Sequence, residues 1–301
     1  MTFKSVKKYV GLREMGTLVV PPVVLPSADW TNFLSGYTSQ LYRWDTDGCT
    51  QFSGSETMAT FCNEMKANGN FSTEALNWFT ANGYFDANGS FAFSQRFTAI
   101  LDGTSINGNV AQSYWSCIQK FGLLPRCDLD YTLAQSQQFN MQQEQDNDYY
   151  NPAVITAAMY AKANAALQWF GIAWGWVATD MASLQKALQT APIQIVVPVP
   201  SPVELWNQQK IPYTGGIDLA HCVELYKIDP TDPYPYYIRD QYSPWGKQLQ
   251  AGYYIGSAIQ GIVIPAVPKP VGVPVNNSTI IPIKSVLPSW LSFILNHLKW
   301  W

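Results

Sequence analysis

A cysteine at the start of a predicted helix is the first feature of this sequence that could do chemistry. A polar loop ends at Gly48 and Cys49, and apolar residues then follow at a spacing of three and four. That spacing predicts an amphipathic helix with Cys49 at its N-terminus. Unpaired N–H groups and the positive end of the helix dipole favour a thiolate there, so Cys49 is a candidate nucleophile; the alternative is a small apolar residue that caps a core helix. The apolar positions are Met58, Phe61, Cys62 and Met65.

A histidine and an aspartate lie on two consecutive predicted strands much later in the chain. His221 opens an alternating stretch that runs to Tyr226, and Asp240 closes the next one. A Trp-Gly turn at 245–246 then leads into a third strand. Such a meander can hold an imidazole beside a carboxylate. The sequence therefore offers a thiol, an imidazole and a carboxylate that could act together.

These motifs, in this order, resemble those of the papain-like cysteine peptidases. In that family a C-W-A-F-S type string contains the nucleophile, H-A-V begins the histidine strand, and N-S-W-G supplies an asparagine that orients the histidine. The strings here are CTQFS at 49–53, HCV at 221–223 and DQYSPWG at 240–246. The resemblance covers residues 29–264. It implies a peptidase domain whose catalytic residues are Cys49, His221 and Asp240.

The resemblance also implies supporting residues. Asp240 replaces the family's usual asparagine, and we expect this to be compatible with activity because a carboxylate also accepts an imidazole N–H. The alternative is that Asp240 is only a turn residue. Trp245 is expected to shield the contact between His221 and Asp240 from water. An oxyanion-hole glutamine commonly lies six residues before the nucleophile, but Arg43 stands there, so we assign that role to Gln40.

The implied reaction is hydrolysis of a peptide bond in a peptide or protein substrate, as by an endopeptidase. Cys49 attacks as the thiolate, His221 moves the proton to the leaving amine, and water then hydrolyses the thioester. The same pair would support acyl transfer or deamidation. The rival hypothesis is a catalytically idle papain-like domain that is a structural or binding component of a larger assembly, such as a phage particle. The string Gly122-Leu-Leu-Pro125 resembles compact members encoded by bacteriophages.

The expected fold is α+β with two lobes. A helical lobe carries the nucleophile helix, and a lobe with an antiparallel sheet carries His221. From 72 to 190 the chain is predicted to be mainly helical, and 192–197 is predicted to be a strand. The Gln- and Asn-rich run 134–148 is predicted to be an exposed loop. The expected helices are 72–81, 91–101, 110–121, 152–169 and 181–188.

Two flanking segments complete the predicted domain organisation. Residues 1–28 are expected to form an extended arm, since their apolar strip is interrupted by prolines. Residues 265–301 contain a Pro-rich linker and an apolar helix, which we expect to bind a protein partner or to mediate self-association. The N-terminus has no run suited to a signal peptide and the tail is no confident membrane span. We therefore expect cytoplasmic synthesis, with incorporation in a virion as the alternative.

Composition bears on the remaining function classes. The 301 residues carry a net charge of −3 and no basic cluster, so nucleic acid is not an expected partner. The five cysteines contain no C-x-x-C and the two histidines are far apart in sequence, so we expect no metal and no other cofactor. Cys117 and Cys127 flank a turn and could form a disulfide; the alternative is reduced thiols.

Overall fold

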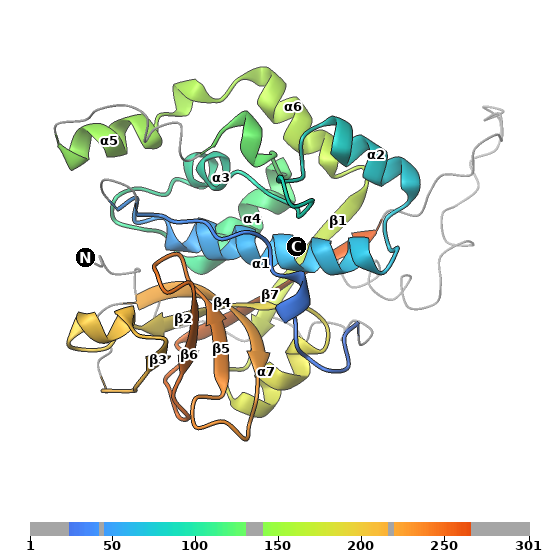
Figure 1. Cartoon of the computed structure of the whole chain (residues 1–301). Helices are drawn as coiled ribbons and strands as arrows, with labels where there is room; N and C mark the ends of the chain where they lie inside the picture. The colour runs from blue at the N-terminus through green and yellow to red at the C-terminus, as the bar shows by residue number, and fades with distance from the viewer. Residues whose placement is uncertain (1–23, 42–44, 131–140, 216–219, 266–301) are drawn as a thin grey trace, which may run out of the picture.

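One long helix, α1 (Cys49–Ala67), lies between a group of helices and a sheet (Figure 1). The computed structural model describes residues 24–41, 45–130, 141–215 and 220–265. The other α-helices are α2 (Thr73–Ala81), α3 (Gln95–Leu101), α4 (Ala111–Phe121), α5 (Gln142–Tyr149), α6 (Ala157–Ala166) and α7 (Met181–Leu188). The strands are β1 (Phe170–Val177), β2 (Ile193–Pro198), β3 (Lys210–Ile211), β4 (Ala220–Ile228), β5 (Tyr236–Arg239), β6 (Gly246–Leu249) and β7 (Ser257–Pro265).

Helix α1 is the central element of the fold. Its predicted apolar face, which includes Met58 and Met65, is buried. Its polar side is buried as well, because α1 packs against α3 and α4 on one side and against β4 on the other. Gly48 is the N-cap, and Gly69 follows the C-terminal end with a φ of +70°, a conformation that glycine adopts without steric cost. Cys49 therefore stands at the start of a helix that contacts both layers.

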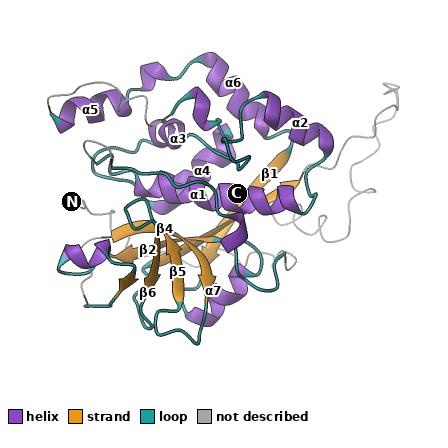
Figure 2. Cartoon of the chain, viewed as in Figure 1, coloured by secondary structure: helices purple, strands orange, loops and turns teal. Residues whose placement is uncertain are grey.

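The described strands form one seven-stranded sheet in the order β1-β7-β2-β4-β5-β6-β3. Neighbouring strands are antiparallel except β3 and β6, which are parallel. The strands β4, β5 and β6 are consecutive in the chain and adjacent in the sheet, so the predicted meander is confirmed (Figure 2). His221 lies on β4, and Asp240 directly follows β5. The fold is α+β with a helical lobe and a sheet lobe, as predicted.

A buried polar cluster ties α1 to the sheet. Arg239 Nε lies 3.6 Å from Glu56 Oε1, and its Nη1 lies 3.9 Å from Glu224 Oε2. Glu56 also accepts hydrogen bonds from the Thr38 hydroxyl at 2.6 Å and from Gln241 Nε2 at 2.9 Å. Burial raises the pKa of both glutamates, to about 7 for Glu224, although Arg239 opposes the shift. The cluster thereby holds Gln241, the residue after Asp240, against the helix of Cys49.

The prediction of an exposed loop at 134–148 is wrong for the part that the structure describes. Residues 142–149 form α5, and Gln145 is buried. The guanidinium of Arg96 on α3 explains why this polar run is ordered: its Nε donates to Tyr149 O at 2.9 Å and its Nη2 donates to Asp148 O at 2.7 Å. A cation at the last carbonyls stabilises a helix terminus. Residues 134–140 lie outside the described residues.

The described part of 72–190 is mainly helical, as predicted, but the prediction did not include the strand β1. Residues 170–177 pair with β7, which lies far along the chain, so local spacing gives no sign of the partner. Trp174 is opposite Gly261 in this register, and a side chain at Gly261 would collide with Trp115 of α4. Tertiary pairing has overridden local propensity here.

Most other predicted helices occur, with shifted ends. The prediction is confirmed for 72–81 and 181–188 by α2 and α7. The helix expected at 91–101 begins only at Gln95, because the Ser94 side chain accepts a hydrogen bond from Phe97 N at 3.1 Å and caps it. The segment that starts at Pro152 makes one 3-10 turn before α6 begins.

Two predicted segments lie mostly outside the residues that the structure describes. The predicted arm at 1–28 is described only from residue 24, and the tail at 265–301 only at its first residue. Within the described part of the chain, no helix is both long enough and apolar enough to cross a membrane.

Cys117 and Cys127 are free thiols, which supports the reduced alternative and not the disulfide.

Replacing Gly122 with alanine should destabilise the fold strongly. Gly122 ends α4 with a φ of +82°, and a Cβ there would lie 1.9 Å from the carbonyl oxygen of Ala163. We expect the free energy of unfolding, measured by urea denaturation, to fall by about 3 kcal/mol or more. Gly103→Ala is the matched control, since Gly103 has a φ of +75° but no atom within 4 Å of the added Cβ. Equal losses in the two variants would show that the close approach to Ala163 is unimportant.

Candidate active site

The Cys49 thiol lies where the helical layer meets the sheet. Cys49 is the first residue of α1 and is 7% exposed, so its side chain is nearly buried at the helix N-terminus, where the first N–H groups have no partner within the helix. Its thiol interacts with Cys222 and with the His221 ring, and both interactions lower its pKa. The structure therefore brings together the thiol and the imidazole that the sequence analysis paired.

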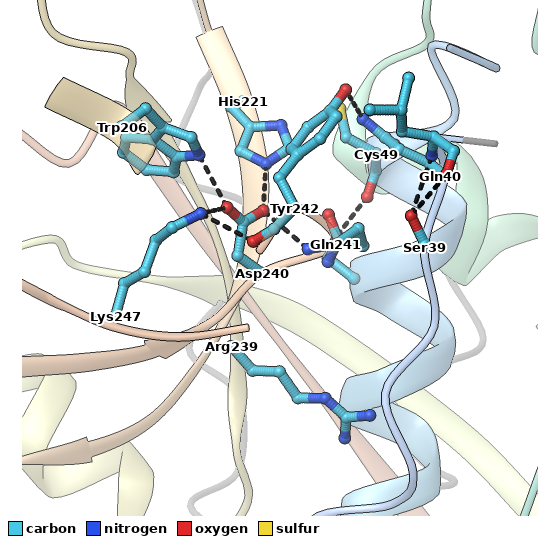
Figure 3. A network of polar contacts seen from close by, with 12 residues as sticks. Ser39, Gln40, Cys49, Trp206, His221, Arg239, Asp240, Gln241, Tyr242 and Lys247 are labelled. Carbon is cyan, nitrogen blue, oxygen red and sulfur yellow. Dashed lines mark hydrogen bonds and ion pairs between the residues drawn. The ribbon is translucent and has the colours of Figure 1, made fainter. Parts of the chain in front are cut away.

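Asp240 lies on the other side of the imidazole. His221 Nε2 and Asp240 Oδ1 are 2.7 Å apart, and both side chains are essentially buried, at 1% and 0% exposure. Because Asp240 engages Nε2, the remaining ring nitrogen, Nδ1, is the one on the side of Cys49 (Figure 3). The backbone N–H of Gln241 also donates to Asp240 Oδ1 at 2.7 Å. The order of groups is thus thiol, imidazole, carboxylate.

Two further side chains, which the sequence analysis did not identify, hold the second oxygen of Asp240. Trp206 Nε1 donates to Oδ2 at 2.7 Å, and Lys247 Nζ also donates to Oδ2 (Figure 3). The Lys247 ammonium donates in addition to Tyr242 O at 2.9 Å and lies 5.1 Å from the centre of the Trp206 ring. Lys247 is 1% exposed. The Asp240 carboxylate therefore lies between His221 and Lys247, and it does more than form a turn.

These contacts set the charges of the site. Burial disfavours the charged His221, but Asp240 and Cys49 outweigh it and raise the pKa of His221 to about 9. The hydrogen bond from Cys222, assisted by His221, holds the pKa of Cys49 well below its usual value in spite of burial. Burial would raise the pKa of Asp240, but His221 and Lys247 keep it below its ordinary value. At neutral pH the arrangement favours a thiolate, an imidazolium and a carboxylate.

Gln40 lies beside this site, in contact with a tyrosine. Gln40 is buried, and its Nε2 donates to the hydroxyl of Tyr242, which in turn donates to Asp45 Oδ2. The Tyr242 ring packs against the His221 ring at a centroid distance of 5.4 Å. The chain of contacts places the Gln40 amide on the Cys49 side of the imidazole (Figure 3). Arg43, which occupies the position where the glutamine commonly lies, is outside the described residues.

The position of Trp245 differs from the expectation. Its ring is only partly buried and stacks on Tyr37 at a centroid distance of 5.8 Å. The ring that packs edge-on against His221, at 5.5 Å, belongs to Trp206. Trp206 lies in a short 3-10 helix, Val203–Asn207, which precedes β4. Sequence spacing could not select it, because the motif at 240–246 points to the tryptophan within the motif itself.

Comparison with known proteins bears on the fold. No protein-family model matches the chain, and no curated protein matches it. Among solved structures, xylellain, a cysteine protease from Xylella fastidiosa, superposes with a TM-score of 0.59 at 14% identity, covering 88% of this chain and 96% of that one. The proform of the ragweed cysteine protease Amb a 11 gives 0.52 at 15% identity, with 83% and 69% covered. Procathepsin L 3 from the larval midgut of Tenebrio molitor gives 0.50 at 15% identity, with 88% and 76% covered.

The chain therefore has the fold of the papain-like cysteine proteases, as the motifs predicted. At these identities the likeness establishes the architecture, and the activity has to be argued from the site. The part of the prediction that concerned a phage particle stays a prediction.

Proposed function

We propose that this protein is a cysteine peptidase that hydrolyses peptide bonds with Cys49, His221 and Asp240. The observation that carries the proposal is the series of contacts in the site. A thiol at a helix N-terminus contacts an imidazole, and the other nitrogen of that imidazole contacts a buried carboxylate. Thiol, base and orienting group in this order are the arrangement that nucleophilic acyl transfer requires. The protease fold favours peptide or protein substrates.

The proposed reaction follows from the charges. The Cys49 thiolate attacks the carbonyl carbon of the substrate, and the His221 imidazolium gives its Nδ1 proton to the leaving amine. Asp240 accepts the Nε2–H throughout, which fixes the ring and stabilises its positive charge. The imidazole, now neutral, then takes a proton from the water that hydrolyses the thioester.

Gln40 is proposed to stabilise the oxyanion. An amide nitrogen carries two hydrogens, and the contact with Tyr242 uses one of them. The other, together with the backbone N–H of Cys49 at the start of α1, can donate to the developing oxyanion. Asp45, through Tyr242, orients the amide.

Trp206 is proposed to take the shielding role that the sequence suggested for Trp245. Its indole covers the edge of His221 and donates to Asp240, so water has less access to the ion pair. A drier site strengthens the attraction between imidazolium and carboxylate.

An epoxysuccinyl inhibitor of cysteine peptidases should modify Cys49 at least about tenfold faster than any other cysteine at pH 6, because the thiolate is the reactive form. Cys127 is the internal control, because it is the exposed cysteine among the described residues. The pKa of its thiol is raised, first by partial desolvation and then by the nearby Asp128. Mass mapping after limited labelling measures the reactivity of each cysteine. Hydrolysis of a peptide substrate, assayed before and after labelling, measures activity. Equal modification of all cysteines would contradict the proposal. Selective labelling without any hydrolysis would favour the idle, structural alternative.

Gln40→Ala should lower kcat about a hundredfold and leave KM nearly unchanged, because an oxyanion donor acts in the transition state. The comparison variant is Tyr242→Phe, which keeps the ring on His221 and removes only the hydroxyl that orients Gln40. We expect a smaller loss there. Steady-state kinetics with one peptide substrate checks both variants, and an unchanged kcat in Gln40→Ala would remove Gln40 from the mechanism.

A further inference from the structure

A buried glutamate on β4, Glu224, has no role in the proposed mechanism. It is 0% exposed and lies directly opposite Arg239 of β5 in the strand register. Glu224 Oε2 is 3.9 Å from Arg239 Nη1, and Glu56 Oε1 on α1 is 3.6 Å from Arg239 Nε. Two buried carboxyl groups therefore share one guanidinium where α1 packs on the sheet. If both were ionised, one negative charge would remain buried without a counter-charge, which is costly.

The hydrogen bonds indicate which of the two carboxyl groups takes a proton. Glu56 accepts from the Thr38 hydroxyl at 2.6 Å and from Gln241 Nε2 at 2.9 Å, and both contacts favour a carboxylate. Among the described residues, neither oxygen of Glu224 has a hydrogen bond of ordinary geometry. Burial raises the pKa of Glu224 and Glu56 adds to the rise, whereas Arg239 and a nearby hydroxyl oppose it, so the pKa is about 7. The proton therefore belongs on Glu224.

The other groups that face Glu224 do not supply a second positive charge. Gln194 of β2, opposite Glu224, is a neutral amide that donates to the backbone and a hydroxyl of α1. Cys222 and Tyr226 lie two residues away on β4 itself. Cys49 and burial raise the pKa of Cys222, and burial raises that of Tyr226 to about 12, so both stay neutral near pH 7. The nearby hydroxyl is that of Thr60 on α1.

The cluster joins the four segments that carry the candidate site. Glu56 is on the helix of the nucleophile, Glu224 is on the strand of the histidine, and Arg239 directly precedes the carboxylate residue. Arg239, which reaches from β5 toward α1 in Figure 3, also donates from Nη1 to Ser35 Oγ at 3.0 Å and from Nη2 to Gly36 O. The chain at 35–36 leads to the proposed oxyanion donor. The charge of Glu224 therefore bears on how these segments are held together.

We propose that Glu224 is a positioning residue that holds a proton in the assembled site, and that its ionisation as the pH rises through neutrality loosens α1 from the sheet. The inference rests on the proposed function only for the identity of the groups that are positioned. With the proton in place, Arg239 neutralises Glu56 and binds 35–36. Without it, two carboxylates compete for one guanidinium from opposite sides of the contact between α1 and β4.

The expected pH dependence has a definite sign. The pKa of Glu224 is raised above its ordinary value of 4.5, so the folded protein binds this proton more tightly than the unfolded chain does. The contribution of Glu224 to stability is therefore present below pH 4.5 and is lost as the pH rises to about 7. Glu224→Gln imitates the protonated form and should not show this loss.

Urea unfolding of the parent protein and of Glu224→Gln, at about pH 5.5 and about pH 8, tests the proposal. Between the two pH values, we expect the unfolding equilibrium constant to rise at least about tenfold more in the parent than in Glu224→Gln. Glu74→Gln is the matched control, because it removes an exposed carboxylate from α2. The control should follow the parent.

Labelling of Cys62 with N-ethylmaleimide under native conditions reports whether α1 is the element that loosens. Cys62 lies on α1 and is 0% exposed, so the reagent reaches it only when the helix opens. At about pH 8 we expect Cys62 to react at least about tenfold more slowly in Glu224→Gln than in the parent, and at about pH 5.5 equally fast. Exposed Cys127 should react equally in the two proteins.

The outcomes separate this inference from the proposed function, because neither measurement uses a substrate. Parallel pH dependence in the parent and in Glu224→Gln would overturn the inference, even in an active peptidase, and so would equal labelling of Cys62 at about pH 8. The expected pH dependence in a protein that hydrolyses no peptide would support it. If Glu224→Gln does not fold, Glu56→Gln gives the answer: it leaves Arg239 to Glu224 alone, so the loss of stability above about pH 5.5 should disappear. Its persistence would overturn the inference.

Discussion

Replacing His221 with alanine should lower kcat/KM for a peptide substrate at least about a thousandfold, because the variant loses both the partner of the thiolate and the proton donor to the leaving amine. His221 contacts Cys49 on one side and Asp240 on the other, so no neighbouring group replaces it. His297, the other histidine of the sequence, provides the control as His297→Ala. Steady-state kinetics and the rate of Cys49 alkylation should be measured on both variants.

The pH dependence of the same variants gives a second readout. In the parent, the ion pair exists above the lowered pKa of Cys49 and below the pKa of about 9 of His221, so kcat/KM should rise and then fall across that window. The raised pKa of His221 means that its favourable interactions are present at lower pH and disappear as the pH rises through about 9. His221→Ala should abolish the alkaline fall and move the onset of alkylation to higher pH. An unchanged profile would show that another base serves Cys49.

Replacing Asp240 with asparagine should destabilise the protein by about 3 kcal/mol or more, because it leaves the buried Lys247 ammonium without its counter-charge. The resembled motif carries asparagine at this position, but the buried partner of Asp240 in this structure is a charged lysine. Lys247 Nζ donates to Asp240 Oδ2 in a place that is 1% exposed, so an amide there cannot neutralise it. We also expect kcat/KM to fall at least about tenfold, since the imidazolium loses its carboxylate.

A double-mutant cycle isolates this pair. Lys247→Met alone leaves Asp240 with His221 as its main charged partner, so the alkaline limb of the pH profile should move up. Asp240→Asn alone should move it down. The double variant Asp240→Asn with Lys247→Met should recover most of the lost stability, measured by urea denaturation, because no unpaired charge remains buried. A double variant less stable than either single variant would contradict the argument.

The sequence predicted which residues would lie together at the candidate site better than it predicted their surroundings. Cys49 was found because helix periodicity begins directly after it, and His221 because an alternating strand begins there. Lys247 was missed, although it shares a strand face with the buried Leu249. That alternation was a usable sign, but a lysine is seldom fully buried unless it is paired, and its partner was visible only in three dimensions.

The misassigned elements have one physical origin. Whether 170–177 is a strand depends on β7, and whether 142–149 is a helix depends on Arg96 at its last carbonyls. Trp206 reaches Asp240 from a separate short helix. In each case the deciding contact comes from a distant part of the chain, which local patterns do not encode.

The position of β7 has a consequence for how this protein is made. This strand, at residues 257–265, is the last in the described chain, yet it lies between β1 and β2 in the sheet. On the ribosome, β1 therefore emerges long before its only neighbour in the sheet order, and the strand that joins it to β2 arrives last. Pairings this distant in sequence form slowly. The sheet that carries His221 can therefore close only after residues 257–265 have been translated, although Cys49 has emerged long before.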